Sequence, residues 1–490
     1  MPRRTGTSSI RGVSLARLWL FLAVALPVLA ALLAPMSSVD LAYHLRAGSE
    51  ILVTRSVPSV DSWTFTAAGQ PWVDQQWGSQ VVLALAERLG GWTGLALLRA
   101  ALTGVIFACL LAIGRRRGLS PRTAALLTLA AFLVAAPALA LRPQLLGMAC
   151  FAVVLLLVDG RQRYPRGLWL VPTIILVWAN LHGSFFLGPA ALGLAWLADR
   201  HDRVALPNRP LLVALISAAA ACLTPFGPAV WVYAVGLSVN PEVTARITEW
   251  QPTSLRDVTG ILFFASALGV AAVLARRAAP VPWPTLAWLG FFFVIGAYAQ
   301  RGVAWWPLGA FVPVAGLLAG SATSAERIDP PLIRRLNLVI VATLTIAAVG
   351  LLPAWRPTVA GSGTPLGAVS QAPAGITAAL RDLALPDDRL FAPQPWGSWF
   401  EYALPALPVA IDSRIEFFPS SVWAQYEAVA SGVDGWQAQL ADWRVSIVVV
   451  RGDGGAFANR LEAAGWVEVY RDGDGRILLR AGRQLAVRGL

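Results

Sequence analysis

The chain has 490 residues, of which 57% are hydrophobic and 13% are charged, and its formal net charge is +12. A soluble domain carries about a quarter charged residues, so this composition excludes an ordinary soluble protein and indicates many membrane-spanning segments. The basic residues stand in short runs without interleaved aromatic residues, which excludes nucleic acid as a partner.

Eleven apolar runs follow one another along the chain and predict about eleven transmembrane helices. The runs cover residues 16–36, 92–113, 123–139, 144–158, 168–180, 184–198, 211–225, 258–275, 283–299, 303–320 and 337–354. Several runs are shorter than the ~20 residues that cross a bilayer core, so neighbouring runs share polar residues at the membrane face. The first run follows four arginines and has the length of an uncleaved helix rather than of a signal peptide.

Arginine is concentrated in every second segment that connects these runs. The Arg-rich segments contain Arg3, Arg4, Arg11 and Arg17, then Arg115–Arg117 and Arg122, then Arg161, Arg163 and Arg166, then Arg200, Arg203 and Arg209, then Arg276 and Arg277, and last Arg327, Arg334 and Arg335. By the positive-inside rule these segments lie in the cytoplasm. The sequence therefore predicts a multi-pass protein of a bacterial inner membrane, with a cytoplasmic N-terminus and an extracytoplasmic C-terminus.

Three domains follow from the composition. Residues 1–355 form the predicted transmembrane domain, whose first outer loop, 37–91, contains two amphipathic helices that lie on the membrane surface. Residues 356–386 are rich in Gly, Pro, Ala, Ser and Thr and are interpreted as a linker. Residues 387–490 alternate strands with helices and predict a small extracytoplasmic α/β domain. The expected strands are 389–393, 409–411, 446–450, 466–470 and 476–480, and the expected helices are 420–431, 434–442 and 456–464.

Five polar groups stand at the borders of apolar runs, and all five fall on the outer face of the predicted topology. They are Asp40 with His44, Arg142, Asn180 with His182, Glu249 with Trp250, and Arg301. Asp40 and His44 are four residues apart and share one face of a helix, where a partly desolvated carboxylate becomes a stronger base. The alternative is that Asp40 caps the surface helix and His44 packs at the interface.

The other four groups each have two interpretations. Arg142 and Arg301 occupy very short outer turns, where a cation either meets an anion such as a lipid phosphate or anchors the chain at the interface. Asn180 and His182 supply hydrogen bonds and a titrating group, or only the geometry of a turn. Glu249 beside Trp250 suits a sugar, and an interfacial aromatic belt is an equal alternative.

The C-terminal domain has a polar and aromatic cluster of its own. Trp396, Trp399 and Tyr402 precede Asp412 and Arg414, a composition that suits a carbohydrate platform. A domain core with a structural Asp–Arg pair is the alternative.

Seven motifs in order resemble the C-type glycosyltransferase superfamily (GT-C), in particular its uncharacterised bacterial membrane branch. The motifs are Asp40–Gly48, Val57–Thr66, Gly69–Trp72 with Trp77, Arg142–Gln144, Trp178–Gly183, Glu249–Pro252 and Ile411–Arg414. The resemblance covers nearly the whole chain. It implies a transferase that takes a sugar from a polyprenyl-phosphate carrier, with the acidic residue of the first outer loop, matched by Asp40, as the catalytic group.

The hypothesis drawn from the residues and the resemblance is a hexosyl- or pentosyltransferase. Asp40, oriented by His44, acts as the general base. Arg142, Arg301 and His182 bind the donor phosphate, and Asn180, Glu249, Trp250 and Asp61 bind substrate. The expected partners are a lipid-linked sugar donor, membrane lipids and a glycan, lipid or protein acceptor. No cofactor is assigned, and a divalent metal is left open.

Two other classes of function compete with this hypothesis. A lipid or polysaccharide transporter, or flippase, predicts polar residues along a path through the membrane, whereas here the polar groups gather at one face. A non-catalytic assembly protein of the cell envelope would use the C-terminal domain as a binding module, and the sequence does not exclude it.

Overall fold

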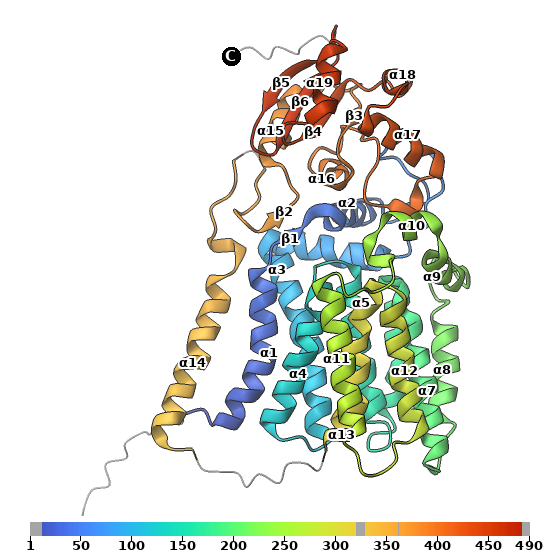
Figure 1. The fold of residues 1–490 in the computed structure, drawn as a ribbon, viewed down its shortest axis with the longest axis vertical. Coiled ribbons are helices and arrows are strands. Elements are labelled where there is room, and N and C mark those ends of the chain that lie inside the picture. The colour runs from blue at the N-terminus through green and yellow to red at the C-terminus, as the bar shows by residue number, and fades with distance from the viewer. Residues whose placement is uncertain (1–11, 320–328, 361, 483–490) are drawn as a thin grey trace, which may run out of the picture.

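The computed structural model describes residues 12–319, 329–360 and 362–482. A bundle of roughly parallel helices carries a small α/β domain at one end (Figure 1). Of the arginines that support the topology prediction, Arg3, Arg4, Arg11 and Arg327 lie outside the described residues. The described Arg-rich segments lie at the opposite end of the bundle from the α/β domain (Figure 1), which agrees with the predicted alternation. The side of the membrane that each end faces remains a prediction.

Helices cover all the predicted apolar runs. They are α1 (Leu15–Leu33), α3 (Trp77–Arg116), α4 (Pro121–Ala135), α5 (Pro143–Asp159), α6 (Val171–Leu181), α7 (Leu187–His201), α8 (Arg209–Ala220), α11 (Val258–Ala275), α12 (Trp283–Tyr298), α13 (Trp305–Leu318) and α14 (Pro331–Gly350). Proline begins several of them, as at Pro121, Pro143 and Pro331, because its fixed φ suits the first turn and its missing N–H is not needed there.

Length and composition allow five helices of the described chain to cross a membrane. These are α1, α3, α11, α14, and α4 together with the short turn that follows it. The apolar helices α5, α6, α8 and α12 are shorter. The helical membrane architecture agrees with the sequence analysis, and the number of eleven spans remains a prediction.

The first outer loop contains two helices that lie across the end of the bundle (Figure 1). α2 (Ser38–Thr54) begins after Ser37, whose hydroxyl accepts the backbone N–H of Val39. α3 bends at Gly91, where a φ of 55° suits glycine, so its first turns run beside α2 and the rest enters the bundle. A Cβ added to Gly48 would lie 2.0 Å from the carbonyl oxygen of Gln80, so the two helix backbones touch. Both predicted surface helices are thus present.

The segment between α8 and α11 lies at the same end of the bundle (Figure 1). It contains α9 (Ala229–Val239), α10 (Pro241–Arg246) and a 3-10 turn, η4 (Thr248–Trp250). A second 3-10 turn, η5 (Gln300–Ala304), joins α12 to α13. These two turns are in contact with each other and carry Glu249, Trp250 and Arg301.

A four-stranded sheet in the order β3-β4-β6-β5 forms the centre of the α/β domain. The strands are β3 (Leu390–Phe391), β4 (Ile447–Arg451), β5 (Val467–Arg471) and β6 (Gly475–Leu479), and the helices are α15 (Ala374–Leu383), α16 (Gln394–Ala403), α17 (Ser420–Ser431), α18 (Trp436–Asp442) and α19 (Gly455–Ala463). β3 is parallel to β4, and β6 is antiparallel to both of its neighbours. The expected strand at 409–411 is reduced to isolated bridges from Val409 to Leu390 and Thr64.

The segment 356–386 differs from the expected linker because it contains regular structure. β2 (Val369–Ser370) pairs in parallel with β1 (Met36–Ser37), next to α2. α15 follows and buries Ile376 and Leu380 completely. Because many Gly and Pro residues precede it, the sequence did not predict this short amphipathic helix, whose buried residues are four apart.

The aromatic cluster of the α/β domain is core and does not form a carbohydrate platform. Trp396, Trp399 and Phe400 are buried on α16, between the sheet and α2. Arg414 pairs with Asp412, as the alternative interpretation expected, and also with Asp61 of the first outer loop at 2.6 Å. The rings of Trp63 and Trp72 lie 4.6 Å from the Arg414 guanidinium carbon. This buried network fastens the α/β domain to the first outer loop.

Candidate active site

Three predicted site residues from distant parts of the chain meet in one ion-pair network. Arg142 caps the start of α5, and its Nη1 lies 3.3 Å from Oδ2 of Asp40 in the first turn of α2. Its Nη2 donates to Oε1 of Glu249, on η4, at 2.8 Å. The Arg142 side chain is 15% exposed, whereas Asp40 and Glu249 are each 35% exposed. Both carboxylates are thus held by one buried cation and still reach solvent.

The contact with Arg142 fixes the direction of the Asp40 carboxylate. The Nε of Arg142 is buried without a hydrogen-bond partner among the described residues. Asp40 is therefore an oriented carboxylate that still reaches solvent.

His44 lies one turn after Asp40 on the same helix, with only 2% of its surface exposed. Its ring packs against Tyr43, with the centroids 4.0 Å apart. Burial first, and then the charges of Arg301 and Arg142, lower the pKa of His44 to about 3. The imidazole is therefore neutral at ordinary pH, and its buried Nδ1 has no partner within the described chain.

A cavity of about 370 Å³ lies beside this network and contains His182, Trp250 and Arg301 in its lining. The Nδ1 of His182 accepts the backbone N–H of Ser184 at 3.2 Å, so the neutral ring carries its proton on Nε2. The other walls come mainly from apolar and aromatic side chains of α9, α12 and α13. An apolar cavity with a few polar groups on one side suits an amphipathic ligand.

Arg301 differs from Arg142 in its partners. Its guanidinium lies over the ring of Trp250 at 5.5 Å. No carboxylate forms a salt bridge with it in the described part of the chain. A smaller cavity of about 110 Å³ is lined by Arg142, Glu249 and Arg301 together, so Arg301 borders both spaces. Arg301 thus lines both cavities without a salt bridge to any described carboxylate, and its charge also acts on Glu416 of the α/β domain.

Asn180 and Asp61 lie elsewhere than the substrate-binding hypothesis expected. The amide of Asn180 accepts from Trp77 Nε1 and donates to two backbone carbonyls, so it secures a turn. The carboxylate of Asp61 is fully buried and is occupied by Arg414 and Thr64. Neither side chain lines the cavities described above.

A second set of polar residues, outside the predicted site residues, lies near the cavity. Asp74 is 3% exposed and accepts from Gln80 Nε2 at 2.7 Å, and burial raises its pKa to about 7. Tyr233 on α9 lines the cavity and its hydroxyl donates to Glu416 of the α/β domain at 3.4 Å. Asp74 lies inside the segment 37–91, away from the predicted apolar runs, so the border signal that identified Asp40 does not apply to it.

The sequence left open whether the protein binds a divalent metal. The described residues contain no group of three or more His, Cys, Asp and Glu side chains placed to hold an ion. Asp40 and Glu249 both turn to the Arg142 guanidinium, which occupies the position between them. The observed donor set therefore does not fit a preformed metal site.

Comparisons with known proteins identify the fold. No family model and no curated protein matches the chain. Among solved structures, the oligosaccharyltransferase AglB from Archaeoglobus fulgidus, in complex with an inhibitory peptide and a dolichol-phosphate, matches with a TM-score of 0.57 and 11% identity over 88% of this chain and 69% of that chain. ArnT from Cupriavidus metallidurans bound to undecaprenyl phosphate matches with a TM-score of 0.51 and 16% identity over 95% of this chain and 98% of that chain.

These matches cover most of the chain, and at such low identity they establish the fold. The protein shares its fold with AglB and ArnT. The shared fold agrees with the fold that the sequence resemblance implies.

Proposed function

We propose that this protein is a membrane glycosyltransferase that moves a sugar from a polyprenyl-phosphate donor to a hydroxyl acceptor at the outer face of the cytoplasmic membrane. The observation that carries the proposal is the position of Asp40. On a GT-C fold, this carboxylate is oriented by Arg142 and reaches solvent, close to a cavity that is lined by Arg301.

The proposed reaction is a single displacement. The acceptor oxygen attacks the anomeric carbon while its proton passes to the Asp40 carboxylate. The bond from that carbon to the phosphate oxygen breaks, and the lipid phosphate leaves with the electron pair. Arg301 stabilises the charge that develops on the phosphate, and the Nε2–H of His182 is a further donor. Attack opposite the leaving group inverts the anomeric centre.

The two arginines then have different tasks. Both were predicted to bind the donor phosphate, but Arg142 already pairs with two carboxylates. We assign Arg142 to positioning Asp40 and Glu249, and Arg301 to the phosphate. Glu249 and Trp250 remain the candidates for binding the sugar, since a carboxylate accepts from sugar hydroxyls and an indole ring packs on its C–H face.

The test is transfer from a polyprenyl-phosphate-linked sugar by the purified Asp40→Asn variant. Loss of a general base costs about 10²–10⁴ in rate, whereas Asn caps a helix almost as well as Asp. Asp387→Asn is the matched control, because Asp387 is an exposed aspartate of the α/β domain. Near-normal turnover by Asp40→Asn would refute the role of Asp40 as the base.

The orientation in the membrane is part of the same proposal. The Arg-rich end is assigned to the cytoplasm and the α/β domain to the outside, by the positive-inside rule. A periplasmic reporter fused after Arg356 should be active. If a cytoplasmic reporter is active there instead, the site faces the wrong compartment.

A further inference from the structure

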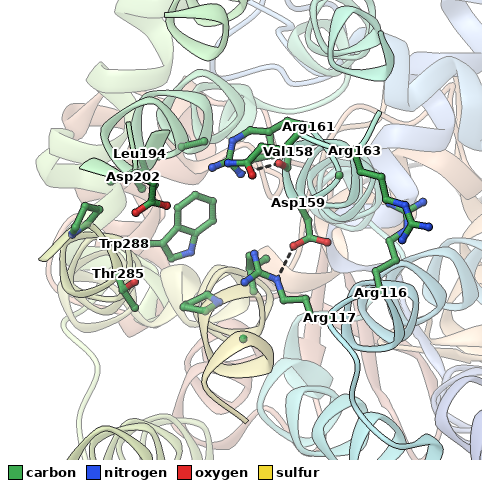
Figure 2. Close-up of a pocket in the computed structure, with 18 of the residues that line it drawn as sticks. Arg116, Arg117, Val158, Asp159, Arg161, Arg163, Leu194, Asp202, Thr285 and Trp288 are labelled. Atoms are coloured by element: carbon green, nitrogen blue, oxygen red, sulfur yellow. Dashed lines mark hydrogen bonds and ion pairs between the residues drawn. The ribbon is translucent and has the colours of Figure 1, made fainter. Parts of the chain in front are cut away.

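A second and larger cavity, of about 580 Å³, opens at the Arg-rich end of the bundle, away from the candidate active site (Figure 2). The ends of α3, α5, α7 and α13 and the beginning of α12 surround it. Four arginines and two aspartates are among its lining residues. The proposed transfer reaction uses none of them.

Two of the arginines are fixed by buried carboxylates. Arg117 Nε donates to Asp159 Oδ1 at 2.6 Å, and the Asp159 side chain is 5% exposed. Arg161 reaches both carboxylate oxygens of Asp199, whose side chain is 3% exposed. Buried carboxylates that orient guanidinium groups around a cavity form a rigid frame, which the positive-inside rule alone does not require.

The other two arginines have no carboxylate partner in the described chain. Arg116 donates only to the backbone carbonyl of Leu156, and Arg163 lies over the ring of Tyr164 at 5.6 Å. The guanidinium of Arg116 lies over the same ring at 5.7 Å. Figure 2 shows both side chains on one side of the cavity, with Asp202 on the opposite side. Two adjacent arginines that no described carboxylate pairs with form a potential anion-binding site.

The remaining wall of the cavity is apolar. The Trp288 indole lies on the side of the cavity opposite Arg116 and Arg163 (Figure 2), and Leu194, Ala195 and Val312 also line the cavity. Because the cavity lies where membrane helices end, a ligand there has its charged group in water and its chain against the helices. The pattern of cations beside an apolar wall matches the two parts of an anionic lipid.

We propose that this cavity binds the phosphate ester of an anionic membrane lipid. Arg116 and Arg163 contact the phosphate, and the hydrocarbon chain packs against Trp288 and Leu194. The carboxylate of Asp202 limits the cation excess, which favours a phosphate diester with a single negative charge over a more highly charged group.

Native mass spectrometry of the full chain in detergent tests the proposal with phosphatidylglycerol, phosphatidylcholine and soluble glycerol phosphate as probes. The combined variant Arg116→Gln/Arg163→Gln should bind phosphatidylglycerol about a hundredfold more weakly, since a hydrogen bond to a charged group is lost at each position. The matched control is Arg166→Gln/Arg335→Gln, which removes the same charge at the same end of the bundle but outside the cavity. This control should bind like the wild type.

A second variant keeps every charge. Thr285 lines the cavity (Figure 2), and Thr285→Trp should fill it and reduce phosphatidylglycerol binding. Preference for phosphatidylglycerol over both other probes identifies the lipid as the source of the phosphate, and equal binding of glycerol phosphate identifies a soluble ester. Equal weakening by the cavity and control variants, or no binding of any probe, would overturn the proposal.

Discussion

Replacing Asp61 by Asn separates a structural carboxylate from a substrate-binding one. Asp61 lies in a GT-C motif of the first outer loop, so the sequence predicted that it binds substrate. In the structure its Oδ1 is 2.6 Å from Arg414 Nη2, and neither side chain is more than 1% exposed. Asn has nearly the same shape, and its oxygen can still accept the N–H and hydroxyl of Thr64. Its NH2 group then faces the Arg414 guanidinium, so the substitution removes one charge and the hydrogen bond to Arg414.

The loss of folding stability in Asp61→Asn depends on how deeply the ion pair is buried and on which partners Arg414 keeps. Breaking a buried ion pair by removing one partner costs about 3–5 kcal/mol, because the other charge stays buried. Arg414 keeps Asp412, whose Oδ2 lies 2.5 Å from Nη2, so the lower end, about 3 kcal/mol, is expected. Glu427→Gln is the control, since Glu427 is 56% exposed and pairs with Arg246 on the surface. Exposed pairs contribute about 0–1 kcal/mol.

The two quantities to measure on the purified variants are the apparent Tm, from thermal unfolding, and the KM for the donor, from steady-state kinetics. Asp61→Asn should lower the apparent Tm by several degrees, roughly the shift that 3 kcal/mol produces in a domain, while the KM for the donor stays near wild type. Glu427→Gln should change neither. An unchanged Tm together with a raised donor KM would show that Asp61 meets substrate and that the assignment to a structural network is wrong.

Three further predictions concern helix contact, pH and donor binding. Gly48→Ala should destabilise the protein by about 1–3 kcal/mol, because its Cβ meets the Gln80 backbone, whereas Gly90→Ala, with open space around it, should not; melting curves compare them. The folded pKa of Asp74, about 7, exceeds its ordinary value of 3.8, so the folded state retains this proton and stability falls as pH rises through that window. Asp74→Asn should flatten the fall of Tm between about pH 4 and pH 7, and parallel curves would contradict it. Arg301→Gln should raise the donor KM at least tenfold and the exposed Arg55→Gln should not, as steady-state kinetics would show.

The helices were predictable because membrane and amphipathic periodicity are local properties. The predicted helix at 420–431 coincides with α17, and the surface helix around Leu41–Leu52 is the core of α2. Local composition gave wrong predictions for two short helices of the C-terminal part of the chain. α15 lies in a stretch of Gly and Pro, and the aromatic residues of α16 face the domain core, where composition alone does not distinguish a core from an exposed platform.

The gathering of the polar groups at one end of the bundle was also predictable, because alternating topology places every second loop together. The sequence did not predict which of these polar groups are in direct contact. Asp40 and Glu249 reach Arg142 across more than a hundred residues of sequence, and the path depends on the fold of the segment between α8 and α11. Asp61 shows the same limit, since its partner Arg414 comes from the other end of the chain.

Arg142 and Arg301 show how one sequence signal leads to two electrostatic environments. Each is an arginine in a short turn between apolar runs, and the sequence assigned the same role to both. The fold brings two carboxylates to Arg142, so its charge orients Asp40 and Glu249 and is largely neutralised. It brings an indole ring to Arg301, which lines both cavities. In the proposed reaction the two arginines therefore differ in role: Arg142 positions the carboxylates that it pairs with, whereas Arg301, which has no salt bridge to a described carboxylate, stabilises the departing phosphate.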